Sequence, residues 1–458
     1  MMIKTLSIEG FRGFNKKQTL HFSIPVNNKP GSGLNILVGS NNSGKTTIIE
    51  SIQSFIGNNP PSFSEGRRNL LTQQRINLEL VDETDQQYTI KTISAGGSST
   101  EKNFPFNLNF YVIPSRRAVA FEFHSMSWDR NFYIAEESKL KSQRSSHLDN
   151  FPARLFQILK KKNEFDKILS KILGKDFSWT IEQRDSGQYY IKHSVGNISH
   201  SAEGIGDGIW SIFTICAALF DAPPDSTIII DEPELSVHPA LQKRLMSLLI
   251  TYSDKYQIII STHSPYFIDW KSIINGASLT RVTKENTEVH CYQLTHECAK
   301  KFEGLMKGMN NPHALGLESK EAFFLEDQII LVEGQEDVLC FQKIQEQLSE
   351  NFNGVFFGWG AGGAANMEKF LNLFKELGYK KIACILDGDQ KEKAESLQKQ
   401  FKEYKIIVLS KNDIRDKQER TTRPKDGITN RQGELKDEHK DEIKSIIQNV
   451  NDFFASRP

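Results

Sequence analysis

The stretch Gly39-Ser40-Asn41-Asn42-Ser43-Gly44-Lys45-Thr46 decides the fold of the first part of this chain. It matches the phosphate-loop pattern G-x-x-x-x-G-K-[ST] at every fixed position. An apolar run at residues 34–38 precedes it, and apolar residues recur at helical spacing from Thr47 to Phe55. A surface turn before a helix is the alternative, but the buried strand and the helix around the loop favour a nucleotide site.

The phosphate-loop pattern predicts how each part of the loop would bind ATP. The backbone amides from Gly39 to Gly44 would surround phosphate oxygens, and the helix that opens with Thr47 would add its partial positive charge. Lys45 would reach the β- and γ-phosphates, and Thr46 would offer its hydroxyl to magnesium.

The composition is typical of a globular intracellular protein. The 458 residues suggest roughly three domains. Because 57 basic residues balance 57 acidic ones, any nucleic-acid surface has to be local. Five dispersed cysteines without a C-x-x-C pair argue against disulfides and zinc. No apolar run approaches the about 18 residues of a membrane span, and the N-terminus lacks a signal-peptide core, so we expect a cytoplasmic protein without membrane contact.

Two carboxylates and a histidine follow two further apolar runs. The β-branched run at 227–230 ends in Asp231-Glu232, and the run at 258–260 is followed closely by His263. Such continuous apolar runs are typical of parallel strands that are buried on both faces. Sheets of α/β proteins bind ligands at the carboxyl ends of these strands. We expect Asp231 to hold magnesium, Glu232 to polarise the attacking water, and His263 to contact the γ-phosphate. A lone histidine would more often be structural, but its order after Asp231-Glu232 favours the functional role.

A serine–glycine stretch precedes the helical run at 209–220. It reads Ser201-Ala202-Glu203-Gly204-Ile205-Gly206-Asp207-Gly208. A serine and glycines that open a helix can bind an anion. An ordinary helix cap at Ser201 or Asp207 is the alternative.

Two features between the phosphate loop and this stretch have open interpretations. Residues 135–175 are rich in Lys, Glu, Leu and Ile at helical spacing, which predicts a small helical insertion. It could pack against a second subunit, or it could be a plain capping hairpin. Arg116-Arg117 follow a short apolar run and could bind phosphate or be a pair of surface cations.

From Ile3 to about Tyr292 the chain resembles an ABC-type ATPase head of the SMC and RecF kind. The phosphate loop, the serine–glycine stretch, Asp231-Glu232 and His263 come in that family's order. The resemblance implies a dimer that encloses two ATP molecules, with Ser201 and Gly204 of one subunit closing on nucleotide held by the other. The stretch differs from the usual L-S-G-G-Q, which leaves the contacting residue open. No long heptad run precedes it, which excludes the long coiled coils of SMC proteins.

A second group of carboxylates follows two other apolar strands. Glu333 ends the run at 329–332, and Asp337 lies one helical turn later on the same side. Asp387 and Asp389 follow the run at 382–386. Four carboxylates at adjacent strand ends cannot all stay ionised without a cation, and ligands that are all oxygen suit Mg²⁺ or Mn²⁺. Solvated turns would explain either pair alone, but the two together favour a metal site that acts on a phosphodiester.

This half of the chain resembles the Toprim domain of topoisomerases, primases and certain nucleases. An ABC ATPase followed by Toprim, with the linker-like segment 316–324 between them, is the arrangement of the overcoming-lysogenization-defect family of nucleases. The resemblance implies metal-dependent DNA cleavage controlled by the ATPase, and a role in phage defence, sometimes with a reverse transcriptase and its DNA product. The family usually places an acid and a lysine after the second aspartate pair, and Lys411 and Asp413 are the candidates here. For the charged tail at 411–444 a mobile solvated segment is favoured over one that orders against DNA.

These observations predict an α/β chain with four segments. Residues 1–134 and 179–312 form an ATPase head, 135–178 a helical insertion and possible dimerisation arm, and 313–458 a Rossmann-like Toprim domain with a charged tail. The predicted function is that of a homodimeric, ATP-binding DNA endonuclease that uses Mg²⁺ or Mn²⁺. An ATPase sensor that cuts RNA such as tRNA, and a DNA-tethering ATPase without nuclease activity, are the alternatives.

Overall fold

The computed structural model divides the chain into two compact units, Met1–Gln293 and Leu294–Pro458. Among the residues described, no helix is both long and apolar enough to cross a lipid bilayer. The structure describes residues 1–57, 59–63, 65–69, 75–105, 108, 110–115, 117, 128–140, 148, 150–174, 177–195, 198–201, 206–308, 311–324, 327–417 and 425–456.

The first unit is built on a six-stranded sheet of order β14-β13-β3-β12-β11-β7. Its strands run parallel except for the antiparallel pair β13 and β14. Every residue of β3, β11 and β12 is buried, as continuous apolar runs predict for a sheet covered on both faces. The strands are β3 (Leu34–Val38), β7 (Tyr111–Ile113), β11 (Thr227–Asp231), β12 (Gln257–Ser261), β13 (Ser278–Glu285) and β14 (Glu288–Gln293).

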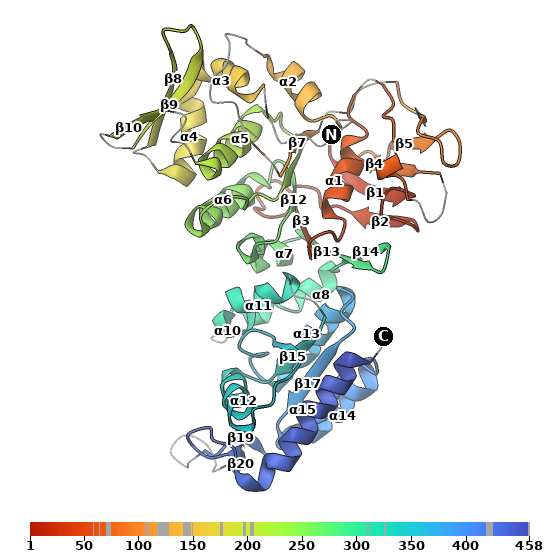
Figure 1. Ribbon diagram of the computed structural model, residues 1–458, viewed down its shortest axis with the longest axis vertical. Coiled ribbons are helices and arrows are strands. Elements are labelled where there is room, and N and C mark those ends of the chain that lie inside the picture. Colours follow the sequence, from red (N-terminus) through yellow and green to blue (C-terminus); the bar gives the residue numbers. More distant parts are fainter. Residues whose placement is uncertain are drawn as a thin grey trace. The chain divides into compact units, whose positions relative to one another are not determined.

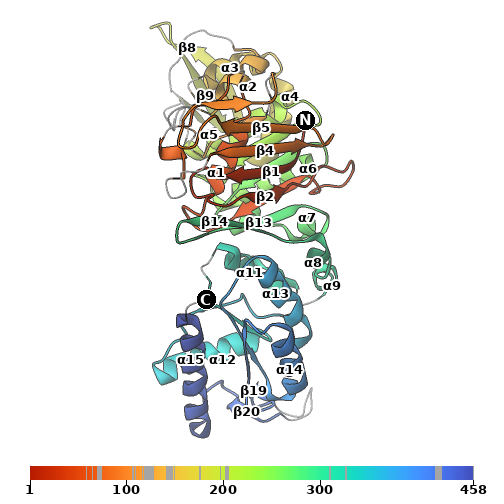
Figure 2. The same cartoon turned by 90° about the vertical axis from the view of Figure 1, so that its right-hand side faces the viewer.

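Helix α1 (Lys45–Gln53) packs between this sheet and a five-stranded antiparallel sheet of order β2-β1-β4-β5-β6. Ile48 and Ile52 of α1 share one core cluster with residues of both sheets, including Ile8 and Ile259. Figure 2 shows the antiparallel strands side by side in front of α1. The strands are β1 (Ile3–Glu9), β2 (Gln18–His21), β4 (Asn77–Asp82), β5 (Gln87–Thr92) and β6 (Thr100–Lys102).

Helices α5 and α6 cover the face of the central sheet opposite α1 (Figure 1). The insertion predicted over 135–178 is helical at first and then continues as a three-stranded sheet of order β10-β9-β8. Trp179 of this sheet packs on Phe165 with ring centroids 5.7 Å apart, so the strands extend the same core and helical spacing could not detect them. The elements are α2 (Arg130–Glu137), α3 (Phe151–Leu159), α4 (Lys162–Leu173), β8 (Phe177–Gln183), β9 (Tyr189–Val195), β10 (Ile198–Ser201), α5 (Asp207–Asp221), α6 (Pro239–Tyr252) and α7 (Trp270–Ile274).

The second unit begins earlier than the predicted boundary after residue 312. Glu376 accepts hydrogen bonds from the amide (2.7 Å) and hydroxyl (3.0 Å) of Thr295, and Phe302 packs edge-on against Phe370. These contacts place the segment after Gln293 with the second unit. Its short helices are α8 (His296–Lys300), α9 (Glu303–Met306), α10 (Asn311–Leu315) and α11 (Leu317–Glu321).

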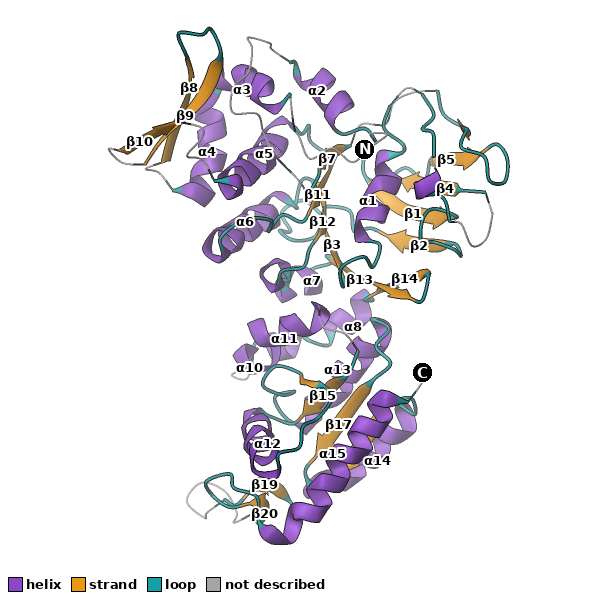
Figure 3. Cartoon of the chain, in the orientation of Figure 1, coloured by secondary structure: helices purple, strands orange, loops and turns teal. Residues whose placement is uncertain are grey.

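The second unit is a parallel sheet of order β16-β15-β17-β18 with helices on both faces. Helices α12 and α15 lie on one side of it, and α13 and α14 lie on the other (Figure 2). Figure 3 shows the strands and helices of this unit in separate colours. The elements are β15 (Ile329–Val332), α12 (Gln335–Leu348), β16 (Val355–Phe356), α13 (Ala364–Glu376), β17 (Ile382–Leu386), α14 (Lys391–Gln400), β18 (Lys405–Val408) and α15 (Lys440–Ala455).

The prediction of a mobile charged tail over 411–444 is wrong for the part that the structure describes. Residues 413–415 and 427–429 pair as the short parallel strands β19 (Asp413–Arg415) and β20 (Gly427–Thr429). Ile414 and Ile428 are fully buried in the same core cluster as α12 and α15. The few apolar residues between the charges therefore anchor the segment to the domain, because burying them removes their surface from water.

Candidate functional site

The phosphate loop joins β3 to α1 in a conformation that requires glycine. Gly39 and Gly44 have φ of 145° and 118°. A Cβ atom on Gly39 would lie 2.1 Å from the carbonyl oxygen of Val282, so no side chain fits there. The ammonium of Lys45 donates to the carbonyls of Gly39 at 2.9 Å and Ser40 at 3.0 Å, which folds it back over the loop. The loop thus has the shape and the positive charge that suit nucleotide phosphates.

The residues expected to hold the nucleotide's magnesium lie together at this loop. The hydroxyl of Thr46 donates to Asp231 at 3.3 Å, and the hydroxyl of Ser261 donates to the other oxygen of the same carboxyl. Burial raises the pKa of Asp231 and lowers that of Lys45 to about 8. Hydroxyl and carboxylate oxygens are hard ligands that suit Mg²⁺.

Glu232, expected to polarise the attacking water, and His263, expected to contact the γ-phosphate, lie near each other. His263 Nε2 lies 3.8 Å from Glu232 Oε1. Burial and then the charge of Lys45 lower the pKa of His263 to about 4, so the imidazole is neutral near pH 7. A neutral imidazole can donate a hydrogen bond to a phosphate oxygen, or exchange one with a polarised water, without adding charge to the site.

The remaining predicted nucleotide residues divide into two groups. Asn42 has φ of 60° within the loop, and Thr47 is a buried residue of the first turn of α1. Ser201 is the last residue of β10, and Gly204 lies outside the described residues. The role of the serine–glycine stretch therefore stays a prediction.

Glu234 is a site residue that the sequence interpretation did not single out. Its carboxyl accepts from the backbone amide of His263 at 2.5 Å and from the hydroxyl of Thr262 at 2.9 Å. Burial raises its pKa. Glu234 thus ties the turn after β11 to the turn after β12. A third acid directly after Asp231-Glu232-Pro233 was the available sequence signal, but a carboxylate on a turn has many possible partners.

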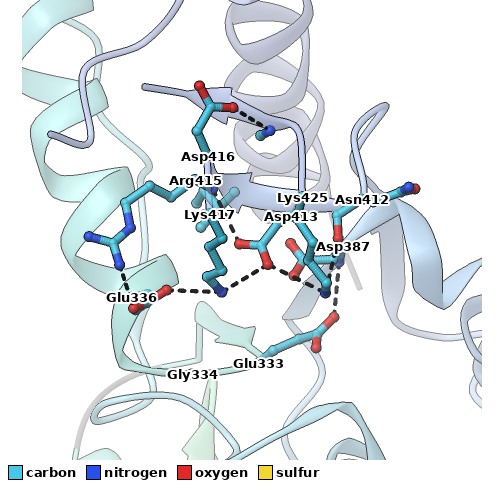
Figure 4. A network of polar contacts seen from close by, with 12 residues as sticks. Glu333, Gly334, Glu336, Asp387, Asn412, Asp413, Arg415, Asp416, Lys417 and Lys425 are labelled. Atoms are coloured by element: carbon cyan, nitrogen blue, oxygen red, sulfur yellow. Dashed lines mark hydrogen bonds and ion pairs between the residues drawn. The ribbon is translucent and has the colours of Figure 1, made fainter. Parts of the chain in front are cut away.

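The second site lies where two neighbouring parallel strands end. Glu333 follows β15, Asp387 follows β17, and these strands are adjacent while β16 pairs on the other side of β15. The connection after β15 leads to β16 on one side, and the connection after β17 leads to β18 on the other, which makes this edge the topological switch point of the sheet. The amide of Asp387 donates to Glu333 Oε1 at 3.0 Å, as Figure 4 shows.

Three carboxyl groups at this edge are only partly neutralised by their surroundings. Burial, then the charges of neighbouring acids, raises the pKa of Asp387 to about 9. Burial also raises the pKa of Asp337 to about 7 and that of Glu333 above its usual value. Asp337 additionally accepts from the amide of Gly334 at 2.7 Å. An oxygen-only donor set with excess negative charge fits a hard divalent cation such as Mg²⁺ or Mn²⁺.

Lysines bind the other acids of the cluster. Lys425 Nζ lies 2.8 Å from Asp389 and 3.4 Å from the buried Asp413, and Lys417 Nζ lies 2.8 Å from Asp413 and 3.0 Å from Glu336 (Figure 4). Burial raises the pKa of Asp389, but the hydrogen bond from Lys425 outweighs this effect, and the pKa lies below its usual value. Within the described ranges no three His, Cys, Asp or Glu side chains have the arrangement that holds a metal ion. Asp389 and Asp413 are instead paired with ammonium groups.

A cleft of about 420 Å³ is lined by these groups except Asp389. Lys411 does not line it, because its ammonium is paired with Asp426 instead, whereas Lys417 and Lys425 do line it. No local pattern distinguishes these two lysines from the other cations of the charged tail. The lining residues are His313, Glu333, Gly334, Gln335, Glu336, Asp337, Trp359, Gly362, Gly363, Asp387, Asp413, Lys417 and Lys425.

Comparisons with known proteins bear on both units. Residues 34–269 match the family described as "AAA domain, putative AbiEii toxin, Type IV TA system". Residues 324–389 match the family described as "Overcoming lysogenization defect protein-like, TOPRIM domain". The chain belongs to the AAA-domain family. Its second unit has an overcoming-lysogenization-defect (OLD)-like Toprim domain. The predicted ABC-type ATPase domain and Toprim nuclease domain are confirmed, and they imply the use of a nucleotide and a divalent metal.

This chain aligns with two known proteins over most of their length. It is 22% identical to the OLD nuclease of Thermus scotoductus over 444 residues, which is 82% of this chain and 80% of that one. It is 25% identical to the Septu protein PtuA of Bacillus thuringiensis over 333 residues, 64% of this chain and 79% of that one. A solved SMC head bound to the C-winged helix domain of ScpA is 17% identical, with a TM-score of 0.44 over 66% of this chain and all of that one. The association with a reverse transcriptase stays a prediction.

Proposed function

We propose that this protein is an ATP-controlled, divalent-metal-dependent DNA endonuclease that acts in anti-phage defence. The observation that carries the proposal is the placement of Glu333 and Asp387 side by side at the switch point of the second sheet, with Asp337 and Asp413 in the same cleft. A phosphodiester at this edge would lie against carboxylates that hold cations, and against Lys417 and Lys425.

The cleft residues have distinct roles in this proposal. Glu333, Asp387 and Asp389 hold Mg²⁺ or Mn²⁺, and Asp337 fixes the turn after β15 through the amide of Gly334. When bound, the metal would neutralise the phosphate charge and activate a water. Lys425, which is paired with Asp389, would exchange this partner for the phosphate oxygens and neutralise the charge that develops there.

The first unit supplies the control in this proposal. Lys45, Thr46 and Asp231 hold magnesium-bound ATP, Glu232 orients the attacking water, and His263 lies beside it. Two copies of the chain would enclose the nucleotide, with residues 201–208 of one closing on ATP held by the other. The similarity to the OLD nuclease and to Septu PtuA supports a role in defence.

Cleavage assays on the full-length protein test the proposal. Supercoiled and linear DNA are incubated with Mg²⁺ or Mn²⁺, with and without ATP. Glu333→Ala and Asp387→Ala should abolish cleavage while ATP binding survives. Lys45→Ala should abolish ATP binding and change only the ATP dependence of cleavage. Intact DNA under every condition contradicts the proposal, and cleavage of added total RNA in place of DNA would move the substrate to RNA.

A further inference from the structure

Arg117 is a buried cation that lies beside the ATPase carboxylates without belonging to the phosphate loop. It follows β7 and is 7% exposed. Arg116, which directly precedes it in the sequence, lies outside the described residues. Burial lowers the pKa of Arg117 to about 10, so the guanidinium is charged near pH 7. A charge in this position has to be bound by polar groups of the protein.

The guanidinium connects two elements that are far apart in the sequence. One terminal nitrogen, Nη1, donates to the hydroxyl of Ser211 at 2.7 Å, in the first turns of α5. The other, Nη2, donates to the backbone carbonyl of Asp231 and, at 3.1 Å, to that of Glu232. Arg117 thus joins the start of α5 to the end of β11.

The backbone at Glu232 has a conformation that needs such support. Glu232 has φ of 50°, in the left-handed region that a residue with a side chain rarely adopts. Its amide donates to the carbonyl of Ser261 in β12 at 3.0 Å. Its carbonyl accepts from Arg117. The peptide groups on both sides of the Glu232 Cα are therefore held, and together they set the direction of its carboxylate.

We propose that Arg117 is a positioning residue for ATP hydrolysis, which aligns the Glu232 carboxylate according to the position of α5. Helix α5 begins at Asp207, near the end of the serine–glycine stretch. A displacement of its first turns would therefore move Ser211 and, through Arg117, the carbonyl of Glu232. The contacts of the Arg117 guanidinium are with one hydroxyl and two backbone carbonyls. The proposal rests on the role of Glu232 in hydrolysis proposed above.

Steady-state ATP hydrolysis by the full-length protein with Mg²⁺ tests the proposal. Arg117→Gln should lower kcat by about tenfold to a hundredfold, since a misdirected general base loses alignment and not binding. KM for ATP should change by less than about threefold, because the ground-state contacts to nucleotide stay. Arg117→Lys should recover part of kcat, because one ammonium can reach the carbonyls but cannot also bind Ser211.

Ser211→Ala isolates the link to α5. It should lower kcat less than Arg117→Gln does, and the double variant should behave as Arg117→Gln alone, because both changes break one connection. Arg154→Lys is the matched control. Arg154 is also a buried arginine and is paired with Asp221, so this change should lower thermal stability but leave kcat unchanged.

Each outcome decides for or against the proposal. An unchanged kcat in Ser211→Ala and Arg117→Lys overturns it, and these two variants keep the test valid if Arg117→Gln does not fold. A raised KM with normal kcat in Arg117→Gln overturns it too, because Arg117 would then bind nucleotide. Glu232→Gln is measured separately. If that variant hydrolyses ATP normally, the role of Glu232 fails, whatever the Arg117 variants show.

Discussion

The carboxyl of Asp387 retains its proton at neutral pH as long as no cation lies beside it. Its folded-state pKa of about 9 exceeds the ordinary value of 3.8. Between these values the folded protein binds more protons than the unfolded chain, so stability falls as pH rises. We predict that, in EDTA, the melting temperature falls from about pH 5 to about pH 9. Thermal unfolding across this range, with and without Mg²⁺, measures the effect, and Mg²⁺ should raise stability most at high pH.

Asp387→Asn is the control for this pH dependence. The amide has no proton to lose, so the fall in melting temperature should be smaller, and Mg²⁺ should stabilise the variant less. An identical pH profile and an identical response to Mg²⁺ in the variant would show that the titration of Asp387 does not cause the fall in melting temperature.

Glu234 is predicted to matter for both stability and hydrolysis. Glu234→Ala leaves the amide of His263 and the hydroxyl of Thr262 without their acceptor. Loss of an acceptor for a buried donor typically costs about 1–3 kcal/mol. We expect the free energy of unfolding to fall by that amount in denaturant titrations and kcat for ATP to fall with it. Glu234→Gln retains one acceptor oxygen and should fall in between; equal effects of the two variants would contradict the bonding shown here.

The strands β19 and β20 show how a charged segment becomes part of a core. Ile428 of β20 is fully buried beside Ile414 and the helices α12 and α15. We predict that Ile428→Ala lowers the free energy of unfolding of the second unit by about 2–5 kcal/mol, as for other large-to-small core changes. Urea unfolding measures this change.

Val355→Ala is the control, because Val355 lies in β16 of the same unit and is 49% exposed. A change of no more than about 0.5 kcal/mol is expected there. If both variants had the same small effect, β19 and β20 would not contribute to the core.

The whole molecule has two units, each with a hydrophobic core of its own. We predict two thermal transitions in calorimetry, with different ligands acting on each. A ligand at a hundred times its Kd stabilises the unit that binds it by about 2.7 kcal/mol. Mn²⁺ without nucleotide should raise the transition of the second unit alone, and ATP with Mg²⁺ should also raise that of the first.

Variants assign these transitions. Lys45→Ala should remove the response of the first unit to ATP and leave the response to Mn²⁺, and Glu333→Ala should do the reverse. If either variant removed both responses, the two sites would not be separate.

Local patterns in the amino-acid sequence were sufficient to place both sites on their strands. The phosphate loop, Asp231-Glu232, Glu333 and Asp387 each follow a continuous apolar run, and such a run needs only its own residues to indicate a buried parallel strand. The structure has strands in all these places.

Other features depend on which strands become neighbours, and short-range patterns do not contain that information. The pairing of β15 with β17 brings Glu333 to Asp387, the fold of the charged tail brings Lys417 and Lys425 into the cleft, and the guanidinium of Arg117 reaches backbone carbonyls of β11. A lysine or arginine on a polar segment looks the same in sequence whether it is solvated or buried. The partners of such a side chain depend on how distant segments pack. Arg117 and Ser211, for example, are 94 positions apart in the sequence, and they meet only when the whole unit folds.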